Sequence, residues 1–454
     1  MNYSLNELNT ILNSNKLNIK NDIFIKGIAI DSRKVQKGDL FIPFIGENVD
    51  GHDYIDTAFK NGASASLSMK KNISTKNNII FVEDSLVAIQ KLAENYLTKL
   101  NAKVIAITGS NGKTTTKDIV SEILSSKYKV NKTSGNYNNE LGLPLTILAT
   151  PEDTEILVLE MGADGFGQLE FLSKLTQPDF AIITNIGESH IEFFKDRSGI
   201  ARGKFEITSH LKKDGLFIYN GDEELLNNIV KSSKINYISC GINSNNKVIL
   251  ENYTQENDII RFNISNIDSE LKTKLKGKHN LLNIMYASVI AKSLNISDEN
   301  IIKSIENIKT ITKMRLENID YGNNSLIIND AYNASPTSMK AAIDVLEEIN
   351  GYSYKTTVLG DMYELGSNEI NFHKEIGLYI SKNKNTTINK VISVGKLGKN
   401  ITDTIDNKNI EIKSFTTTKE VAEYLKENKK TNEIILFKAS RGMKLETVIE
   451  EIKK

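Results

Sequence analysis

The segment from Ile105 to Thr116 constrains the fold of this chain more than any other stretch. Its apolar start is short enough for a buried strand, it breaks at Gly109 and Gly112, and the residues from Lys113 onward open a helical pattern. A glycine-rich turn between a strand and a helix lets backbone N–H groups and the helix N-terminus face an anion. The segment therefore predicts a phosphate-binding loop.

Side chains in this segment strengthen that prediction. Lys113 adds a positive charge, and the Thr114 hydroxyl is suited to magnesium. The loop is not of the standard long type, because Ile107 stands five positions before Gly112 where a glycine is usual. The alternative is an ordinary glycine-rich turn. We expect contacts to a bound nucleotide from Thr108, Gly109, Ser110, Asn111, Gly112, Lys113 and Thr114.

The chain has 454 residues, which is too long for one hydrophobic core and predicts two to four domains. Lysines plus arginines equal aspartates plus glutamates, 57 of each, so we expect no nucleic-acid-binding surface. A single cysteine, Cys240, excludes an intrachain disulfide framework and favours a reducing compartment. The N-terminus lacks a cationic start with an apolar core, and no apolar run is long enough to span a bilayer. These features predict a cytoplasmic protein without membrane insertion.

The first hundred residues predict a small α/β unit. Strand-like runs at 23–30, 40–44 and 79–82 alternate with helical patterns at 54–61 and 86–100. Asp31, Ser32 and Arg33 directly follow the first predicted strand. A guanidinium beside a hydroxyl can hold several phosphate oxygens at once. A turn closed by Asp31 explains the same residues equally well.

Three polar side chains follow apolar runs in the middle third. Glu160 ends a predicted buried strand, His190 follows the next strand-like run, and Lys204 lies on a partly apolar helical face. In an open parallel sheet the carboxyl ends of strands face the ligand crevice, so Glu160 should reach a metal beside Thr114. A lone His or Lys is more often structural. The case for these residues rests on their ordered succession.

Two further stretches of the middle third carry polar side chains. Residues 135–146, which include Asn138 and Asn139, predict a loop over the site or a surface turn. Residues 277–287 predict a helix whose first turn has a polar side facing a nucleoside base, although capping by Asn280 explains part of the pattern.

From Thr312 onward strands and helices alternate regularly. This alternation predicts a doubly wound parallel sheet. Polar loops follow three of its strands, at 330–336, 360–366 and 438–444. Helix caps explain each loop separately, but three loops on one sheet edge favour a second ligand surface. The predicted strands are 326–329, 356–359, 390–394, 410–415 and 433–437, and two of the predicted helices are 337–349 and 444–452.

Six of these stretches together resemble the Mur ligases of peptidoglycan synthesis. No single stretch is decisive, but their order along nearly the whole chain is highly specific. Asp330-Ala331-Tyr332-Asn333 and Gly360-Asp361-Met362-Tyr363-Glu364-Leu365-Gly366 look most like the member that adds D-alanyl-D-alanine. The six stretches are 108–116, 135–146, 185–190, 330–336, 360–366 and 440–443.

The resemblance implies an α/β protein of three domains: a uridine-nucleotide (UDP-MurNAc) domain at 1–100, a central P-loop ATPase-type parallel sheet at 101–311 and a Rossmann-like domain at 312–454. It also implies that ATP phosphorylates the terminal carboxylate of UDP-N-acetylmuramoyl-tripeptide. The amine of D-alanyl-D-alanine then attacks the acyl phosphate, and phosphate leaves. Transfer of a phosphoryl group between anions needs cations and positioning above all. ATP and Mg²⁺ are the implied cofactors, and we expect a monomer.

Site residues are carried over by their match to the family motifs. Lys113 neutralises phosphates, Thr114 and Glu160 hold one magnesium, and His190 resembles the ligand of a second. Lys204 aligns with a lysine that family members carbamylate, which turns a cation into a metal-binding anion. The remaining roles are Asn283 toward adenine, Asp330 toward ribose, Arg315 toward phosphates, Asn333 toward the dipeptide, Asn138 and Asn139 toward substrate, and Asp31, Ser32 and Arg33 toward the uridine nucleotide.

Two positions depart from the family pattern. Arg202 stands where a lysine is frequent, and Tyr363 stands where a small residue is frequent. Two other functions also fit the motifs. A sibling activity would add diaminopimelate, lysine or glutamate to a related acceptor, and a nucleotide-dependent switch or transporter-like NTPase would hydrolyse ATP without a carboxylate acceptor.

Overall fold

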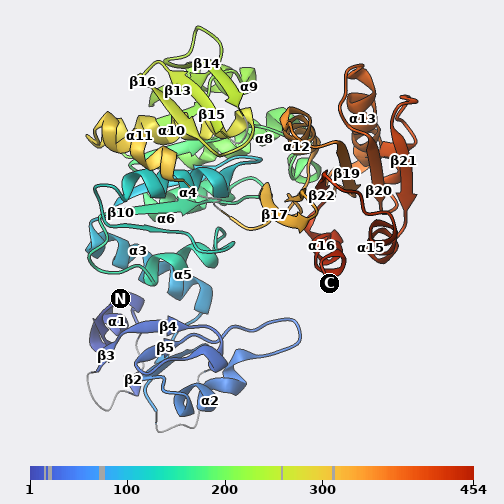
Figure 1. Ribbon diagram of the computed structural model, residues 1–454. Helices are drawn as coiled ribbons and strands as arrows, with labels where there is room; N and C mark the ends of the chain where they lie inside the picture. The colour runs from blue at the N-terminus through green and yellow to red at the C-terminus, as the bar shows by residue number, and fades with distance from the viewer. Residues whose placement is uncertain (15–16, 19–22, 71–76, 257–258, 309–311) are drawn as a thin grey trace.

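The chain folds around three main β-sheets of five, nine and six strands, which follow one another along the sequence. The computed structural model describes residues 1–14, 17–18, 23–70, 77–256, 259–308 and 312–454. The five-stranded sheet lies at one end of the molecule, and the six-stranded sheet lies beside the nine-stranded one (Figure 1). The predicted α/β class is confirmed. The expected domain boundary after residue 311 falls at residues outside the described part of the chain.

The N-terminal sheet is parallel from β4 to β7, with β2 antiparallel to β7 at its edge. The single strand predicted at 23–30 is wrong, because the chain changes partner at Lys26: β3 pairs with β1, and β4 pairs with β5. The sheet order is β2 (Leu17–Asn18), β7 (Ile79–Phe81), β6 (Ala65–Ser68), β5 (Asp39–Phe41) and β4 (Gly27–Ala29), and the separate pair is β1 (Tyr3–Ser4) with β3 (Phe24–Ile25). Its helices are α1 (Leu5–Leu12) and α2 (Ile55–Lys60).

The central sheet is parallel from β9 to β14 and continues into two antiparallel strands, β15 and β16, that we did not predict. Strand β8 lies between β10 and β11, so the chain moves to opposite sides of β8 there, and such a point forms a ligand crevice at the carboxyl ends of the strands. The order is β16 (Ile267–Thr273), β15 (Ile259–Ile264), β14 (Val248–Glu256), β13 (Asn236–Gly241), β12 (Leu216–Asn220), β11 (Phe180–Ile183), β8 (Lys103–Thr108), β10 (Ile156–Glu160) and β9 (Val130–Lys132).

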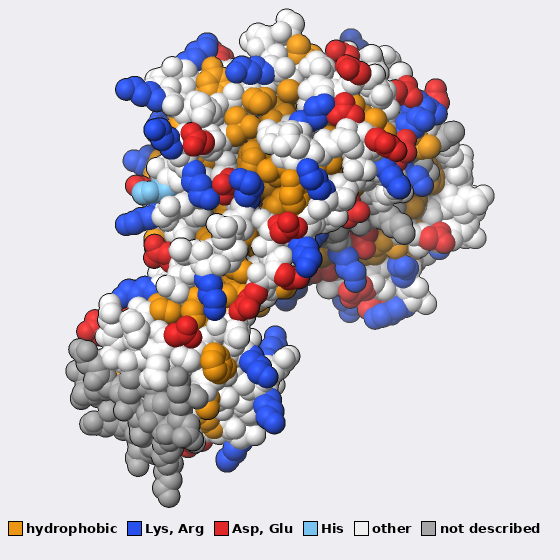
Figure 2. All heavy atoms as spheres, turned by 90° about the vertical axis from the view of Figure 1, so that its left-hand side faces the viewer, with side chains coloured by type: hydrophobic (Ala, Val, Ile, Leu, Met, Phe, Trp, Pro, Cys, Tyr) orange, Lys and Arg blue, Asp and Glu red, His pale blue; other side chains and the backbone are white. Residues whose placement is uncertain are grey.

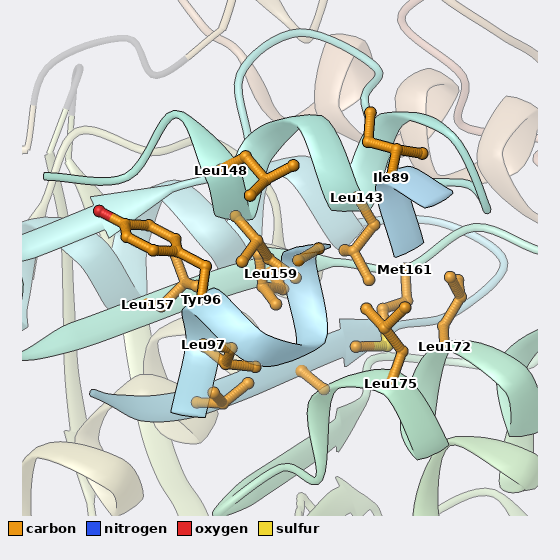
Figure 3. Packing of buried hydrophobic residues seen from close by; sticks show 14 of the residues in the cluster. Ile89, Tyr96, Leu97, Leu143, Leu148, Leu157, Leu159, Met161, Leu172 and Leu175 are labelled. Atoms are coloured by element: carbon orange, nitrogen blue, oxygen red, sulfur yellow. The ribbon is translucent and has the colours of Figure 1, made fainter. Parts of the chain in front are cut away.

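Alternate residues of the central strands enter two different cores. Ile105 and Ile107 pack under α4 (Lys113–Leu124), α10 (Lys278–Ser293) and α11 (Asp298–Asn307), whereas Val104 and Ala106 face α3, α5 and α6. Burial on both faces explains why these strands are apolar throughout. Figure 3 shows the second core, with side chains of α3 (Ser85–Leu100), α5 (Gly142–Leu148) and α6 (Gln168–Thr176) around Leu157, Leu159 and Met161.

This second core also corrects one prediction. The stretch 135–146 is a loop only as far as Leu141, because the apolar residues after it form α5 against α3 and β10. Three more helices complete the central unit: α7 (Ile191–Phe194), α8 (Arg197–Phe205) and α9 (Glu224–Lys231).

The C-terminal sheet confirms the predicted doubly wound arrangement. Five of its strands are parallel, and an antiparallel strand that we did not predict, β17, pairs with β18 at one edge. Cores cover both faces, one with α12, α13 and α14 and the other with α15 and α16. The order is β17 (Glu317–Gly322), β18 (Ser325–Asn329), β22 (Glu433–Lys438), β19 (Tyr354–Gly360), β20 (Lys390–Val394) and β21 (Glu411–Phe415), and the helices are α12 (Pro336–Glu348), α13 (Glu369–Lys382), α14 (Lys399–Thr402), α15 (Thr418–Glu427) and α16 (Glu446–Ile452).

Charges of both signs are mixed over the face shown in Figure 2, and hydrophobic side chains gather in the middle of the larger upper body. The smaller body below it joins through a narrower waist. Within the described residues, the helices are too short or too polar to cross a membrane.

Candidate active site

The predicted phosphate loop connects β8 to α4. Gly109 has a φ of 149° and Gly112 a φ of 79°, values that residues other than glycine rarely adopt. A Cβ on Gly109 would also lie 1.9 Å from Oγ1 of Thr184. Gly112 is the N-cap of α4 and offers no side-chain cap. The first N–H groups of this helix therefore remain available to an anion.

A second loop, which follows β11, holds the phosphate loop in place. The side-chain Oδ1 of Asn185 accepts a hydrogen bond from the backbone N–H of Asn111 at 2.8 Å. The backbone carbonyl of Asn185 accepts one from the N–H of Ser110 at 3.1 Å. The N–H of Gly187 donates to Oγ of Ser110 at 2.9 Å. These bonds fix the loop before any ligand arrives, which favours a preorganised site.

Lys113 lies at the start of α4 and bends back over the loop. Its Nζ donates to the carbonyl of Gly109 at 2.8 Å. Burial lowers the pKa of the Lys113 amine, the Glu160 carboxylate opposes this shift, and Arg315 adds to it. Two domains thus contribute charge at one place, because Arg315 comes from the chain segment just before β17.

Glu160 ends β10 next to this loop and keeps one oxygen unused. Its side chain is only 4% exposed, and Oε1 accepts from Nδ2 of Asn138 at 3.1 Å. Among the described residues, Oε2 of Glu160 and Oγ1 of Thr108 are buried without a hydrogen-bond partner. Buried polar atoms without partners are rare, and a cation would satisfy these two oxygens.

The donors near Glu160 fit magnesium better than a metal held by protein alone. The described residues contain no group of three or more His, Cys, Asp or Glu side chains placed to hold an ion. Magnesium is usually bound through one or two carboxylates together with substrate phosphates and water. Glu160 and Thr114 beside a phosphate loop match that pattern.

His190 follows β11 and reaches the C-terminal unit. Its Nδ1 lies 2.6 Å from Oε2 of Glu364, in the loop after β19. This contact lowers the pKa of the Glu364 carboxyl. His190 adopts a φ of 62°, and the N–H of Glu192 donates to the carbonyl of Glu364 at 3.4 Å. The loop predicted to end in a histidine therefore contacts the predicted loop 360–366.

Lys204 is buried in α8 without a counter-ion. The residue is 1% exposed, its amine has no hydrogen bond or ion pair with a described residue, and its Nζ lies 5.9 Å from the centre of the Phe194 ring. Burial, with a smaller contribution from Lys113, lowers the pKa of Lys204 to about 7. A fraction of its amine is therefore neutral and nucleophilic near neutral pH.

A cavity of about 790 Å³ lies between the central and C-terminal units. Asn283 and Asn280 line it from α10, where Nδ2 of Asn283 donates to Oδ1 of Asn280 at 3.1 Å. His279 lies beside them, and its burial lowers the pKa of the imidazole. The volume of the cavity suits a nucleotide-sized ligand. The predicted residues that line it are Asn111, Gly112, Asn283, Arg315, Asp330 and Asn333.

The C-terminal wall of this cavity is a charged cluster. Asp330, directly after β18, lies 2.5 Å from Nζ of Lys438, at the end of β22. Nζ of Lys438 also donates to the carbonyl of Asn333 at 3.1 Å. Arg315 packs over the ring of Tyr332, 4.1 Å from its centre. The loops 330–336 and 438–444 thus meet at this wall, and the loop 360–366 joins the second of them, because the N–H of Ser440 donates to the carbonyl of Asp361 at 3.0 Å, as we predicted for the sheet edge.

The other predicted site residues do not line the cavity. Lys113 lies close enough to Glu160, Lys204 and the cavity-lining Arg315 for their charges to influence one another, whereas His190 contacts Glu364. Asn139 closes a turn, because its Oδ1 accepts from the N–H of Gly142 at 2.8 Å.

Asp31 and Arg33 form the turn that we considered as the alternative. Asp31 caps the short 3₁₀ turn Ser32–Lys34 and binds the Arg33 guanidinium at 2.8 and 2.9 Å. The Arg33 side chain is 85% exposed, and Ser32 is buried.

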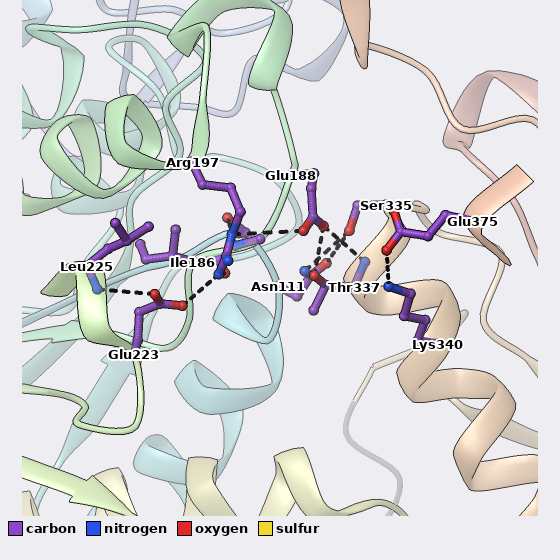
Figure 4. A network of polar contacts seen from close by, with 12 residues as sticks. Asn111, Ile186, Glu188, Arg197, Glu223, Leu225, Ser335, Thr337, Lys340 and Glu375 are labelled. Carbon is purple, nitrogen blue, oxygen red and sulfur yellow. Dashed lines mark hydrogen bonds and ion pairs between the residues drawn. The ribbon is translucent and has the colours of Figure 1, made fainter. Parts of the chain in front are cut away.

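Sequence reasoning missed the residues that join the two units. Glu188 accepts from the N–H of Thr337 at 3.0 Å, and Nδ2 of Asn111 donates to Oγ of Ser335 at 3.4 Å (Figure 4). Lys438 lies in the predicted loop 438–444, but the sequence did not assign it a role. The feature that could have identified it is its position as a lysine directly after an apolar strand.

Three family models match consecutive parts of the chain. Residues 24–108 match the catalytic domain of the Mur ligase family, residues 107–291 match the Mur ligase middle domain, and residues 314–441 match the Mur ligase glutamate ligase domain.

Curated relatives match over nearly the full length. A UDP-N-acetylmuramoyl-tripeptide--D-alanyl-D-alanine ligase from Bacillus subtilis is 45% identical over 433 residues, covering 94% of this chain and 93% of the relative. The enzyme of that name from Escherichia coli is 32% identical, covering 87% of this chain and 86% of the relative.

Solved structures agree with this similarity. MurF from Acinetobacter baumannii superposes with a TM-score of 0.90 at 28% identity, covering 100% of this chain and 99% of the other. MurF ligase from Thermotoga maritima in complex with ADP has a TM-score of 0.83 at 32% identity, covering 94% and 97%.

Proposed function

This chain belongs to the Mur ligase family, and from that premise we propose that it uses ATP to join D-alanyl-D-alanine to UDP-N-acetylmuramoyl-tripeptide. The product is the UDP-MurNAc-pentapeptide precursor of peptidoglycan. Residues 1–100 form the domain for the uridine nucleotide, 101–311 the ATP domain and 312–454 the domain that closes over both. The enzyme acts as a monomer in the cytoplasm, and one chain supplies every group that the reaction needs.

The observation that carries this proposal is the cavity between two units. Asn111 and Gly112 of the phosphate loop line it from one side, and Arg315 and Asp330 line it from the other. A nucleotide in this cavity would contact both units. Asn283 lies at the adenine end, and Asp330 retains oxygen lone pairs for the ribose hydroxyls.

The first step transfers a phosphoryl group between two anions. An oxygen of the tripeptide carboxylate attacks the γ-phosphorus of ATP, a new P–O bond forms, and ADP leaves. The N–H groups at the start of α4, together with Lys113 and Arg315, stabilise the charge on the phosphoryl oxygens. Because these groups are fixed beforehand, little reorganisation is needed in the transition state.

Magnesium fits the unpartnered Oε2 of Glu160 described above. Thr114 and Glu160 would hold one ion, and His190 and carbamylated Lys204 would hold a second. When bound, magnesium neutralises phosphate charge and aligns the attacking and leaving oxygens. The contact of His190 with Glu364 keeps the imidazole at the domain boundary until substrates bind.

Lys204 has the properties that carbamylation requires. Its neutral amine attacks carbon dioxide, an N–C bond forms, one proton is released, and the product is a carbamate anion. The lowered pKa supplies the neutral amine, and no carboxylate among the described residues pairs with the amine and holds it in its protonated form.

The second step forms the amide bond. The free amine of D-alanyl-D-alanine attacks the acyl carbon, a C–N bond forms, phosphate leaves with the bonding electrons, and the amine loses a proton to solvent. Asn333 and the loop 360–366 face the dipeptide, and Asn138 and Asn139 support the acceptor side. The uridine nucleotide contacts Asp31, Ser32 and Arg33. The exposed guanidinium of Arg33 donates hydrogen bonds to the phosphates of this nucleotide.

Phosphate release measured with different substrates tests the proposal. The enzyme is assayed with the tripeptide nucleotide, with and without D-alanyl-D-alanine, for tripeptides ending in diaminopimelate and in lysine. We expect release to depend on both the acceptor and the dipeptide. Release stimulated by a single amino acid in place of the dipeptide would indicate the sibling activity, and release without any acceptor would indicate a simple NTPase.

A further inference from the structure

The turn that carries Arg315 is strained. Met314 and Leu316, on either side of the arginine, have φ values of 61° and 50°. Residues other than glycine rarely adopt this left-handed backbone conformation, and neighbouring contacts must hold such residues there. The conformation of this turn therefore depends on the groups that bind its backbone.

Two carboxylates bind the backbone of the turn. Oε2 of Glu317 accepts from the N–H of Met314 at 2.9 Å and from Nδ2 of Asn329 at 3.1 Å. Oδ1 of Asp330 accepts from the N–H of Leu316 at 3.2 Å. Both N–H groups that flank Arg315 are thus fixed to the start and end of the β17–β18 hairpin.

Lys438 fixes Asp330 in turn. Its side chain is 4% exposed, and its Nζ lies 2.5 Å from Oδ2 of Asp330, the oxygen that Leu316 does not use. The same Nζ donates to the carbonyl of Asn333 at 3.1 Å. The ammonium therefore connects the end of β22 with the segment after β18.

Arg315 has an unpaired hydrogen-bond donor. Its Nε is buried without a hydrogen-bond partner among the described residues, although its guanidinium packs on Tyr332 and lines the cavity. A buried unpaired guanidinium donor beside a cavity points to an anionic ligand. Its usefulness depends on where the strained turn places it.

We propose that Lys438 is a positioning residue: through Asp330 it holds the 314–316 turn so that Arg315 meets the phosphates of the nucleotide. This inference rests on the proposed ATP-dependent function. Lys438 and Asp330 also line the cavity, so the positioning role is the part of the effect of Lys438 on nucleotide affinity that requires Arg315.

A double-mutant cycle tests this dependence. Affinity for a non-hydrolysable ATP analogue is measured by titration calorimetry for the wild type, Lys438→Met, Arg315→Ala and the double variant. We expect each single variant to bind about tenfold to hundredfold more weakly, the range for losing a charge-assisted hydrogen bond. The loss in the double variant should be smaller than the sum of the two single losses, since without Arg315 the positioning effect of Lys438 has nothing left to act on.

A matched control separates this effect from general destabilisation. Lys390 is another buried lysine of the same sheet, it pairs with Glu411 at 3.2 Å, and it lies at the amino end of β20, away from the cavity. Lys390→Met should lower the melting temperature and leave nucleotide affinity unchanged. In turnover assays, Lys438→Met should raise KM for ATP and leave KM for D-alanyl-D-alanine unchanged.

Additive losses in the cycle would overturn the proposal, because Lys438 would then act independently of Arg315. Lys438→Met leaves a buried carboxylate unpaired, so Lys438→Gln, which keeps an N–H donor toward Asp330, is the second variant. It should show a smaller loss of affinity, and this loss should also shrink in the Arg315→Ala background. Unfolding of both variants would overturn the proposal in favour of a stability role, whereas failure of the wild type to bind the analogue would refute the proposed function itself.

Discussion

The carboxylate of Glu188 binds the first turn of α12 through Thr337, at 3.0 Å from its backbone nitrogen and 2.7 Å from its hydroxyl oxygen. Glu188 belongs to the loop after β11 and Thr337 to the C-terminal unit, so these bonds cross between domains (Figure 4). A negative charge at a helix N-terminus is favourable. This contact holds the C-terminal unit beside the phosphate loop.

Glu188→Ala should loosen the C-terminal unit. Hydrogen bonds to a charged group contribute about 1.5–3 kcal/mol, a large share of what holds a mobile domain interface. We expect a larger radius of gyration in X-ray solution scattering without nucleotide. Glu375→Ala is the control, since Glu375 pairs with Lys340 within the C-terminal unit. Identical scattering from Glu188→Ala and the wild type would contradict the role.

Lys113→Ala should abolish turnover without harming the fold. The variant removes positive charge from the phosphate loop, and loss of such stabilisation lowers kcat by at least about 10²-fold. Its melting temperature should not fall, because removing a buried ammonium also removes a desolvation cost. Phosphate release and thermal unfolding check both expectations. Lys129→Ala, which alters an exposed pair with Asp153, serves as the control, and near-normal release by Lys113→Ala would refute the role.

Lys204→Ala should be nearly inactive and regain part of its activity with a short-chain carboxylic acid. The added carboxylate fills the space of the missing side chain and supplies the anion that the carbamate would provide. Ligase assays over a range of acid concentrations measure the recovery. The same acid should not restore Lys113→Ala, which lacks a cation. No recovery of Lys204→Ala at saturating acid would argue against carbamylation, as would the lack of a carbamate signal in ¹³C NMR with labelled bicarbonate.

Much of the site was predictable because parallel strands place their carboxyl ends at one edge. Glu160 at the end of β10 and the phosphate loop after β8 lie at the carboxyl edge of the central sheet, and Asp330 after β18 lies at the carboxyl edge of the C-terminal sheet. The same rule predicted that the loops after β18, β19 and β22 would adjoin. Local sequence was sufficient for these features, since each depends on where a buried strand stops.

Other features depend on contacts that local sequence does not encode. The approach of Glu364 to His190 results from docking of two domains, and no spacing along the chain predicts it. Strands β15 and β16 carry polar residues on one face, which weakens their apolar signal. Asp31 and Arg33 fitted a turn and a phosphate site equally, and only the structure shows the turn.

The last prediction concerns His373, which is buried and supports the loop 360–366. Its Nε2 accepts from the N–H of Met362 at 2.9 Å, and its Nδ1 donates to the carbonyl of Glu369 at 2.7 Å. Protonation would place a second N–H against the donor of Met362. Burial lowers the pKa of His373 below its ordinary value near 6.5. The unfolded chain therefore binds more protons than the folded chain between that lowered pKa and 6.5.

The contribution of His373 to the free energy of unfolding therefore falls as the pH drops through 6.5, by at most about 1.4 kcal/mol per pH unit. It levels off below the lowered pKa. His373→Gln cannot be protonated and should lose this dependence, so the stability advantage of the wild type should shrink with acidification. Urea unfolding followed by circular dichroism from pH 8 to 5 measures the difference. Parallel profiles for the wild type and His373→Gln would mean that protonation of His373 does not oppose folding.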